Sequence, residues 1–219
     1  MTKEDHLVAW KKQLDGLKED IADLWVRKDL FNRLQAISRK NPAISNPGHF
    51  LMWMARNYAD AECSGIRRMV DKRSGTRSIT RLLESIQRNH DAVSLERMRT
   101  VHSNMDATRL NRYLQPMFRG KSCLDPDVVR EDLVALEAIT AKVKKYTDHR
   151  IAHEGEAFEI ETPRFDDIHR AIKHIEDLLF KYRELLTGEH WIPLEGAAWG
   201  TAPEKVFEKA WLIRKEGRT

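Results

Sequence analysis

The chain has 219 residues, which is enough for one domain with a sizeable core, or for one domain and an appendage. Hydrophobic residues make up 41% of it and charged residues 33%, and the formal net charge is +4. This composition is typical of a globular protein with a highly charged surface. The mild positive charge permits a nucleic-acid partner without requiring one.

Membrane and secreted classes are not favoured by this sequence. No apolar run approaches membrane-spanning length, and the N-terminus lacks the apolar core of a signal peptide. Cys63 and Cys123 are far apart and belong to no motif, so we expect reduced structural thiols rather than a disulfide. Together these features predict a cytoplasmic protein that does not enter a membrane.

The first third of the chain predicts two long helices. Over residues 5–40, apolar side chains recur every three or four positions and form one helix face, with Lys28 as the only gap. That face consists of Leu7, Trp10, Leu14, Leu17, Ile21, Leu24 and Phe31. A second helix is expected over about residues 49–70, and one of its faces begins apolar and ends polar at Arg68 and Asp71.

The middle of the chain predicts short helices. Ser78 can cap a helix that carries apolar residues up to Ile86. Residues 95–101 and 107–114 read as two more short helices within a basic stretch, 89–122. The basic residues of this region are either solvated helix faces or a phosphate-binding face.

The last third predicts two further long helices. Asp125-Pro126 combines an N-cap with proline at the first helical position, and the apolar pattern after it continues to His153. Thr162-Pro163 repeats this signature before another helix, which Gly188 ends. No strand pattern competes anywhere. The sequence therefore predicts an all-α fold, an up-and-down bundle of four to five main helices.

Two parts of the chain are expected on this basis. Residues 1–188 form the bundle, and residues 189–219 form a tail that contains three tryptophans and a short helix near 204–215. Exposed indole rings cost free energy, so we expect the tail to dock on the bundle or on a partner.

Ionisable residues gather at the end of the helix that starts at Pro126. Arg150 and His153 continue its apolar face, and polar groups on an inward face need partners or a wet cleft. Lys144 and Lys145 precede them and are candidate phosphate-binding residues. We expect the functional site here.

Metal and phosphate-loop chemistry are not indicated at this site. His149 and His153 are spaced i, i+4 and could share a metal ion, but no third ligand is evident, although Glu154 and Glu156 lie nearby. The chain has no glycine-rich phosphate loop, and no serine or cysteine lies in a nucleophile signature. We expect neither a metal nor a cofactor.

Arg68 and Asp71 allow two interpretations. At i, i+3 they can form a structural salt bridge at a helix end. Alternatively they lie beside His153, where Asp71 would orient the imidazole and Arg68 would bind phosphate.

Two segments resemble a known family. Asp148-His149-Arg150-Ile151-Ala152-His153 is similar to the "D-K-R-I-A-H" signature of HEPN domains, in particular of their AbiU2-like branch, which is known from abortive-infection phage defence. The stretch 65–71, followed by 78–83, resembles the "I-x-R-L-x-D … S-L-x-x-L-L" block of that branch. The order and the separation of the two blocks also fit.

The resemblance implies a helical HEPN bundle, commonly a homodimer, and in many members a metal-independent ribonuclease with an R-x(4–6)-H motif. His153 matches the histidine, whereas Tyr146, Thr147 and Asp148 occupy the arginine positions. Arg150 lies on the same helix face as His153 and is the candidate substitute. The implied catalytic residues are therefore His153, Arg150, Asp148 and His149.

Two functions remain open from the sequence. The first is a HEPN-type endoribonuclease or toxin-like effector, in which the ribose 2′-hydroxyl attacks its own phosphodiester while His153 transfers protons. The second is a non-catalytic HEPN module that binds RNA, a nucleotide or a protein. An antitoxin or a nucleotidyltransferase is the expected kind of protein partner.

Overall fold

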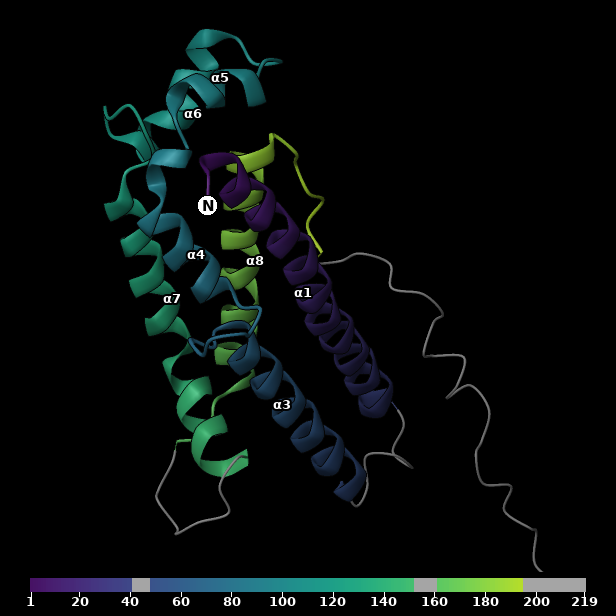
Figure 1. Ribbon diagram of the computed structural model, residues 1–219. Coiled ribbons are helices and arrows are strands. Elements are labelled where there is room, and N and C mark those ends of the chain that lie inside the picture. Colours follow the sequence, from purple (N-terminus) through teal and green to yellow (C-terminus); the bar gives the residue numbers. More distant parts are fainter. Residues whose placement is uncertain (41–47, 152–160, 195–219) are drawn as a thin grey trace, which may run out of the picture.

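The structure, a computed structural model, describes residues 1–40, 48–151 and 161–194, and for Arg150 and Ile151 it describes the backbone alone. Within these ranges the fold is all-α, as predicted, with seven α-helices and no strand (Figure 1). The long helices are α1 (Lys3–Lys40), α3 (His49–Met69), α7 (Pro126–Tyr146) and α8 (Phe165–Thr187). The shorter ones are α4 (Ile79–Arg88), α5 (Leu95–Val101) and α6 (Ala107–Phe118), with a 3₁₀ turn at His90–Ala92.

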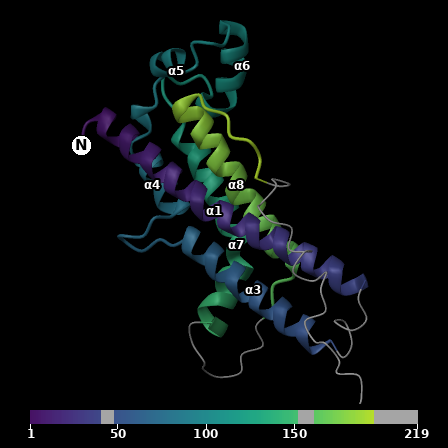
Figure 2. The ribbon, with the colours of Figure 1, turned by 90° about the vertical axis from the view of Figure 1, so that its right-hand side faces the viewer.

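The helices form an up-and-down bundle. Helix α1 runs down the molecule in Figure 1, α3 and α4 together run back up, α7 runs down and α8 runs up, while α5 and α6 cover the upper end. Helix α8 packs between α1 and α7, and both α3 and α4 pack against α7 (Figure 2). Helices α3 and α4 therefore share one position of a four-position bundle, separated by the loop at residues 70–78.

The apolar face of α1 is buried along its length, as its spacing predicts. All seven residues of that face, from Leu7 to Phe31, are at most 6% exposed. Burial of each such large side chain stabilises the fold by roughly 1.5–3 kcal/mol. The gap in the pattern, Lys28, places its ammonium 4.0 Å from the centre of the Trp25 ring, so it covers the core edge instead of entering it.

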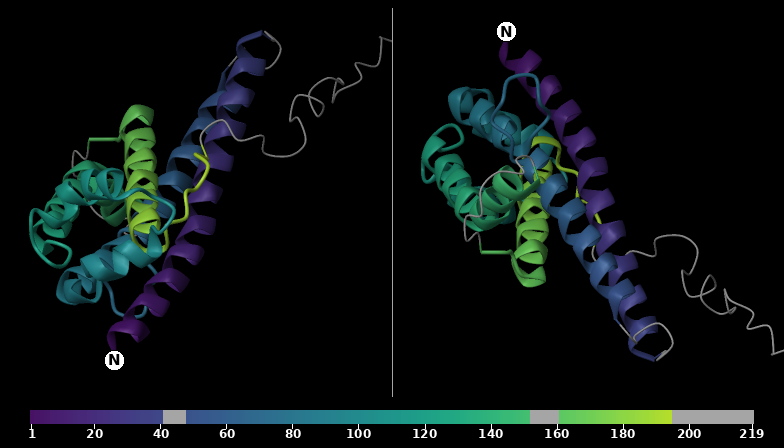
Figure 3. Two further views of the ribbon diagram at one scale, coloured as in Figure 1. Left: turned by 90° about the horizontal axis from the view of Figure 1, so that it is seen from above. Right: turned by 90° about the horizontal axis from the view of Figure 1, so that it is seen from below.

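Helix α3 lies close against the second half of α1, as the views along the bundle show (Figure 3). Gly65 makes this approach possible, because a Cβ there would lie 2.6 Å from Leu24 Cδ2. Further along, Tyr58 stacks on Phe31 with ring centres 4.0 Å apart, and Phe165 of α8 closes the cluster. These contacts fix the rotation of α3 about its axis, and so decide which of its polar residues face α7.

Helix ends agree with the sequence in most places. Ser78 caps α4 by accepting a hydrogen bond from the Arg81 backbone, and Asp125 caps α7 in the same way. Helix α6 runs past Leu114 to Phe118, because Met117 and Phe118 are buried and hold its last turn.

One predicted helix start is wrong. Helix α8 begins at Phe165, two residues after Pro163, and Arg164 is its N-cap residue. The Asp167 carboxylate accepts a hydrogen bond from the Arg164 backbone N–H at 3.1 Å, which fixes the start at this point. At the other end, Gly188 adopts the left-handed conformation and ends the helix as predicted.

The chain after α8 turns back along the bundle. The Trp191 ring meets Phe180 at 5.6 Å, with Lys18 Nζ 4.7 Å from its centre, and the Leu194 N–H donates to the buried Glu176. Trp199, Trp211 and the expected helix at 204–215 lie outside the described residues, so the division of the chain after residue 188 stays a prediction.

The structure also bears on the cysteines and on the hydropathy of the helices. Both thiols are free, and burial raises the pKa of Cys63 to about 12, so it stays protonated at neutral pH. None of the described helices is long and apolar enough to cross a membrane.

Candidate functional site

The candidate site lies where α7 ends. The α-helix stops at Tyr146, and the chain continues as a π-helical turn over Thr147–Ile151. π-Helical turns are rare in proteins, and those that occur are often at functional sites. Tyr146 anchors the turn, because its hydroxyl donates a 2.7 Å hydrogen bond to Asp60 of α3. The predicted helix to His153 is therefore an α-helix followed by a wider turn, and residues 152–160 lie outside the described part of the chain.

Arg67 of α3 joins the two family-like segments. Its Nε donates to Asp148 Oδ1 at 2.7 Å, and its Nη1 lies 3.4 Å from Asp71 Oδ1. The hydrogen bond to Asp148 is the main reason that the pKa of Arg67 is raised. The guanidinium is therefore a fixed positive charge between two carboxylates, at the junction of α3 with the π-helical turn.

Asp71 is held from two sides. Its carboxylate also accepts from the backbone N–H of Arg73 at 3.1 Å and lies 3.2 Å from the Arg73 guanidinium. Burial acts to raise the pKa of Asp71, but the hydrogen bond from the Arg73 backbone and the charges of Arg73 and Arg67 outweigh it and lower the pKa. Asp71 is therefore an ionised structural anchor for Arg67 and for the loop after α3.

The predicted pair between Arg68 and Asp71 is replaced by another. Asp71 pairs with Arg67, while the Arg68 guanidinium points to α1 and lies 3.4 Å from Asp20. Both spacings from Asp71, i−3 and i−4, suit a helix. Packing against α1 decides between them: the side chain of Arg67 is 21% exposed and that of Arg68 is 59% exposed. Arg67 is the residue that the sequence reading missed, and its i, i+4 spacing from Asp71 was the available signal.

The other predicted residues divide into two groups. His149 and Lys145 are exposed on the last turns, and Lys144 is half-buried. The Arg150 side chain and His153 lie outside what the structure describes, so the expected proximity of Arg68 and Asp71 to His153 stays a prediction.

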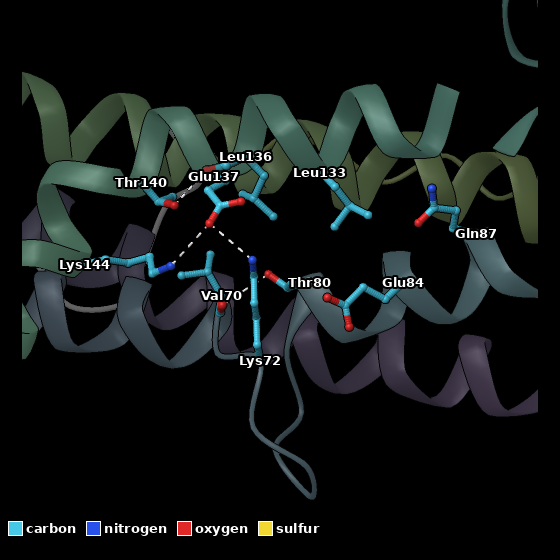
Figure 4. A pocket seen from close by; sticks show the side chains of 10 residues that line it. All are labelled: Val70, Lys72, Thr80, Glu84, Gln87, Leu133, Leu136, Glu137, Thr140 and Lys144. Carbon is cyan, nitrogen blue, oxygen red and sulfur yellow. Dashed lines mark hydrogen bonds and ion pairs between the residues drawn. The ribbon is translucent and has the colours of Figure 1, made fainter. Parts of the chain in front are cut away.

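A small cavity of about 160 Å³ lies between α4 and α7 (Figure 4). Lys72 and Lys144 point to the Glu137 carboxylate from two sides, with Nζ–Oε1 distances of 3.2 and 3.9 Å. The charge of Lys144 is therefore partly balanced by Glu137, and a phosphate in this cavity would have to compete with that carboxylate.

A buried carboxyl group lies five residues before Arg67 on α3. Glu62 is fully buried, and its carboxylate accepts a 2.7 Å hydrogen bond from Arg27 Nε. Burial raises the pKa of Glu62 to about 7, and the Arg27 charge opposes that rise without cancelling it. Among the described residues, no three His, Cys, Asp or Glu side chains are grouped so as to hold a metal ion.

Comparison with known families identifies the chain. The family model of the AbiU2 group of HEPN domains matches residues 7–198, which is most of the chain. The chain belongs to the HEPN AbiU2 family. The match covers both segments that Arg67 joins and places the chain in a family of abortive-infection phage defence. No curated protein and no solved structure shows significant similarity to it.

Proposed function

We propose that this HEPN AbiU2 protein is a metal-independent endoribonuclease. The observation that carries the proposal is the contact of Arg67 with Asp148. Asp148 occupies one of the positions at which the family motif has its arginine, and here α3 brings a guanidinium to that position from outside the helix. A positive charge is thus kept at the place where the motif requires one, although the motif itself lacks it.

The reaction needs proton transfer and charge stabilisation. The ribose 2′-hydroxyl attacks the adjacent phosphorus, and the 5′-oxygen of the next nucleotide leaves, which yields a 2′,3′-cyclic phosphate and a 5′-hydroxyl. His153 takes or gives the proton, because imidazole titrates near neutral pH. Arg150 and Arg67 stabilise the negative charge on the phosphoryl oxygens, while Asp148 and Asp71 position Arg67.

A second copy would complete the site. The first turns of α3 expose Phe50, Met52 and Trp53, which are 42%, 61% and 62% exposed, beside a hollow of about 280 Å³ between α1 and α3. Exposed apolar patches of this kind mark interaction surfaces. They support a homodimer, in which two His153 side chains would face one another; an antitoxin or a nucleotidyltransferase is the alternative occupant.

A non-catalytic RNA- or protein-binding module is the second candidate, and one observation favours it. Two carboxylates already contact Arg67, so much of its charge is neutralised before any phosphate arrives. A guanidinium has five N–H donors, however, and these contacts use two of them. Within the described residues, three donors are left for a substrate.

Cleavage assays separate the two candidates. The purified protein should cleave single-stranded RNA in the presence of a chelator, with 2′,3′-cyclic phosphate ends on the products. His153→Ala should lower the rate by roughly 10²–10⁴-fold, which is the usual contribution of a positioned acid or base. His190→Ala is the matched control, because that imidazole is exposed after the end of α8 and pairs with Glu184. If the wild-type protein cleaves no RNA, with or without a genomic partner, the binding module is the function.

A further inference from the structure

A larger hollow, of about 510 Å³, opens next to the candidate site. Its floor is apolar and consists of Ala55 and Ala59 of α3 and of Pro163 and Phe165 at the start of α8. Tyr146, the residue before the π-helical turn, also lines it. The hollow and the candidate site therefore share the end of α7 and both include residues of α3.

Two arginines stand at the rim of this hollow. Arg56 and Arg164 are both exposed, and neither guanidinium pairs with another described residue. The described lining contains no carboxylate. The neighbouring hollow between α7 and α8, which Arg164 also lines, is more acidic, because Glu161, Asp166 and Asp167 line it. Within the described part of the chain, the first hollow is therefore lined by two arginines and by no carboxylate.

This combination suits one nucleotide of a single strand. The volume lies within the range of small-molecule sites, and a base has a flat apolar face that can lie on an apolar floor. Guanidinium groups at the rim match the phosphates on either side of that base. A paired base could not reach such a floor without leaving its duplex, which favours single-stranded RNA.

We propose that the hollow bounded by Arg56, Arg164 and the floor of Ala55, Ala59, Pro163 and Phe165 binds an unpaired RNA nucleotide next to the cleaved phosphate. The inference rests on the proposed function in naming RNA as the ligand. Because Tyr146 lines the hollow and precedes the turn that contains Asp148, a strand seated there passes its next phosphate towards Arg67. The hollow then supplies affinity, while the end of α7 supplies chemistry.

Binding to an uncleavable probe tests the inference apart from catalysis. The probe is a fluorescent single-stranded RNA of about eight nucleotides with 2′-O-methyl groups throughout, and anisotropy gives its dissociation constant over a range of salt concentrations. Arg56→Ala and Arg164→Ala should each weaken binding by up to about 5-fold, as for one exposed charge contact. Each should also reduce the slope of log affinity against log salt by about 0.7, the value for one phosphate contact on a single strand.

A charge-matched control and a shape variant keep the test decisive. Arg109→Ala removes an exposed arginine on α6, at the opposite end of the bundle, and should leave binding unchanged. Ala55→Phe fills the hollow without changing its charge and should weaken binding as much as either arginine variant. If Arg109→Ala alone loses affinity, the RNA binds at α6 and the inference is wrong. If the wild-type protein does not bind the probe at all, the inference is also overturned.

The two proposals can fail separately. If the protein binds the probe through Arg56 and Arg164 but never cleaves natural RNA, the hollow stands and the ribonuclease proposal is wrong. If it cleaves RNA while Arg56→Ala, Arg164→Ala and Ala55→Phe bind the probe like the wild type, the ribonuclease stands and the hollow is not its subsite.

Discussion

At its start, helix α7 is held by residues close to it in the sequence, whereas its end is held by another helix. Asp125 caps the first turn and accepts from Lys121, four residues away. At the other end, Asp60 and Arg67 of α3 hold Tyr146 and Asp148. The start obeys local rules of capping, while the end departs from the α-helix and depends on packing. Functional sites often lie where tertiary contacts, rather than local sequence preferences, determine the backbone conformation.

In the comparison of the two ends of α7, the largest expected effect concerns Arg67. If it stabilises the transition state, Arg67→Ala should lower RNA cleavage by roughly 10²–10³-fold, as removal of one preorganised donor does in other enzymes. Arg67→Lys should recover little, because an ammonium cannot hold Asp148 and a phosphate with the same planar geometry. The rate constant under single-turnover conditions measures this, after circular dichroism has shown that each variant is folded. Cleavage at the wild-type rate by Arg67→Ala would reduce Arg67 to a structural role.

The next largest effect is the change of folding stability with pH that Glu62 causes. The pKa of Glu62 is raised to about 7 in the folded protein from an ordinary value near 4.5. A raised carboxyl pKa means that the folded state binds the proton more tightly, so this contribution is complete below about pH 4.5 and is lost as pH rises through 7. A pKa shift of this size lowers the free energy of unfolding by about 3 kcal/mol by pH 8.

Urea unfolding between pH 4.5 and 8 measures that loss. Glu62→Gln should lack it, since its amide does not titrate, whereas Glu131→Gln should keep it. Glu131 is the matched control because its carboxylate is exposed near the start of α7 and pairs with Arg119 at 2.6 Å. An unchanged pH dependence in Glu62→Gln would show that another group is responsible.

The sequence predicted the long helices because their signal is local and repeated. The face of α1 is readable from spacing alone, and so are the caps at Ser78 and Asp125. The position of the site stays a prediction, and the sequence did not predict the contacts that the structure shows around Asp148. Arg67 and Arg68 are equivalent by spacing, and the close packing of Gly65 on Leu24, which spacing does not reveal, turns one of them to α7. The π-helical turn has no sequence signal of its own, since it depends on what α3 holds in place.

A smaller effect is expected at the start of α7. Asp125→Ala removes an N-cap and a partner of Lys121, and should lower the melting temperature by roughly 2–4 °C in a protein of this size. Cleavage at a temperature well below the transition should not change, because the start and the end of α7 are separated by the length of the helix. A large loss of activity in this variant would show that the two ends are coupled.

The smallest effect is expected for Arg68, the neighbour that the sequence suggested as a phosphate ligand. Its guanidinium is 59% exposed and lies 3.4 Å from Asp20, which Arg77 also contacts at 3.1 Å. Exposed ion pairs of this kind add little stability, and Asp20 keeps a partner when Arg68 is removed. Arg68→Ala should therefore change the melting temperature by less than about 1 °C and the cleavage rate by less than about 3-fold. The comparison with Arg67→Ala is matched in residue type, helix and charge, so the two variants differ chiefly in the direction in which the side chain points. If Arg68→Ala lost as much activity as Arg67→Ala, the orientation of α3 against α7 would be wrong, and the sequence-based assignment of Arg68 would be the better one.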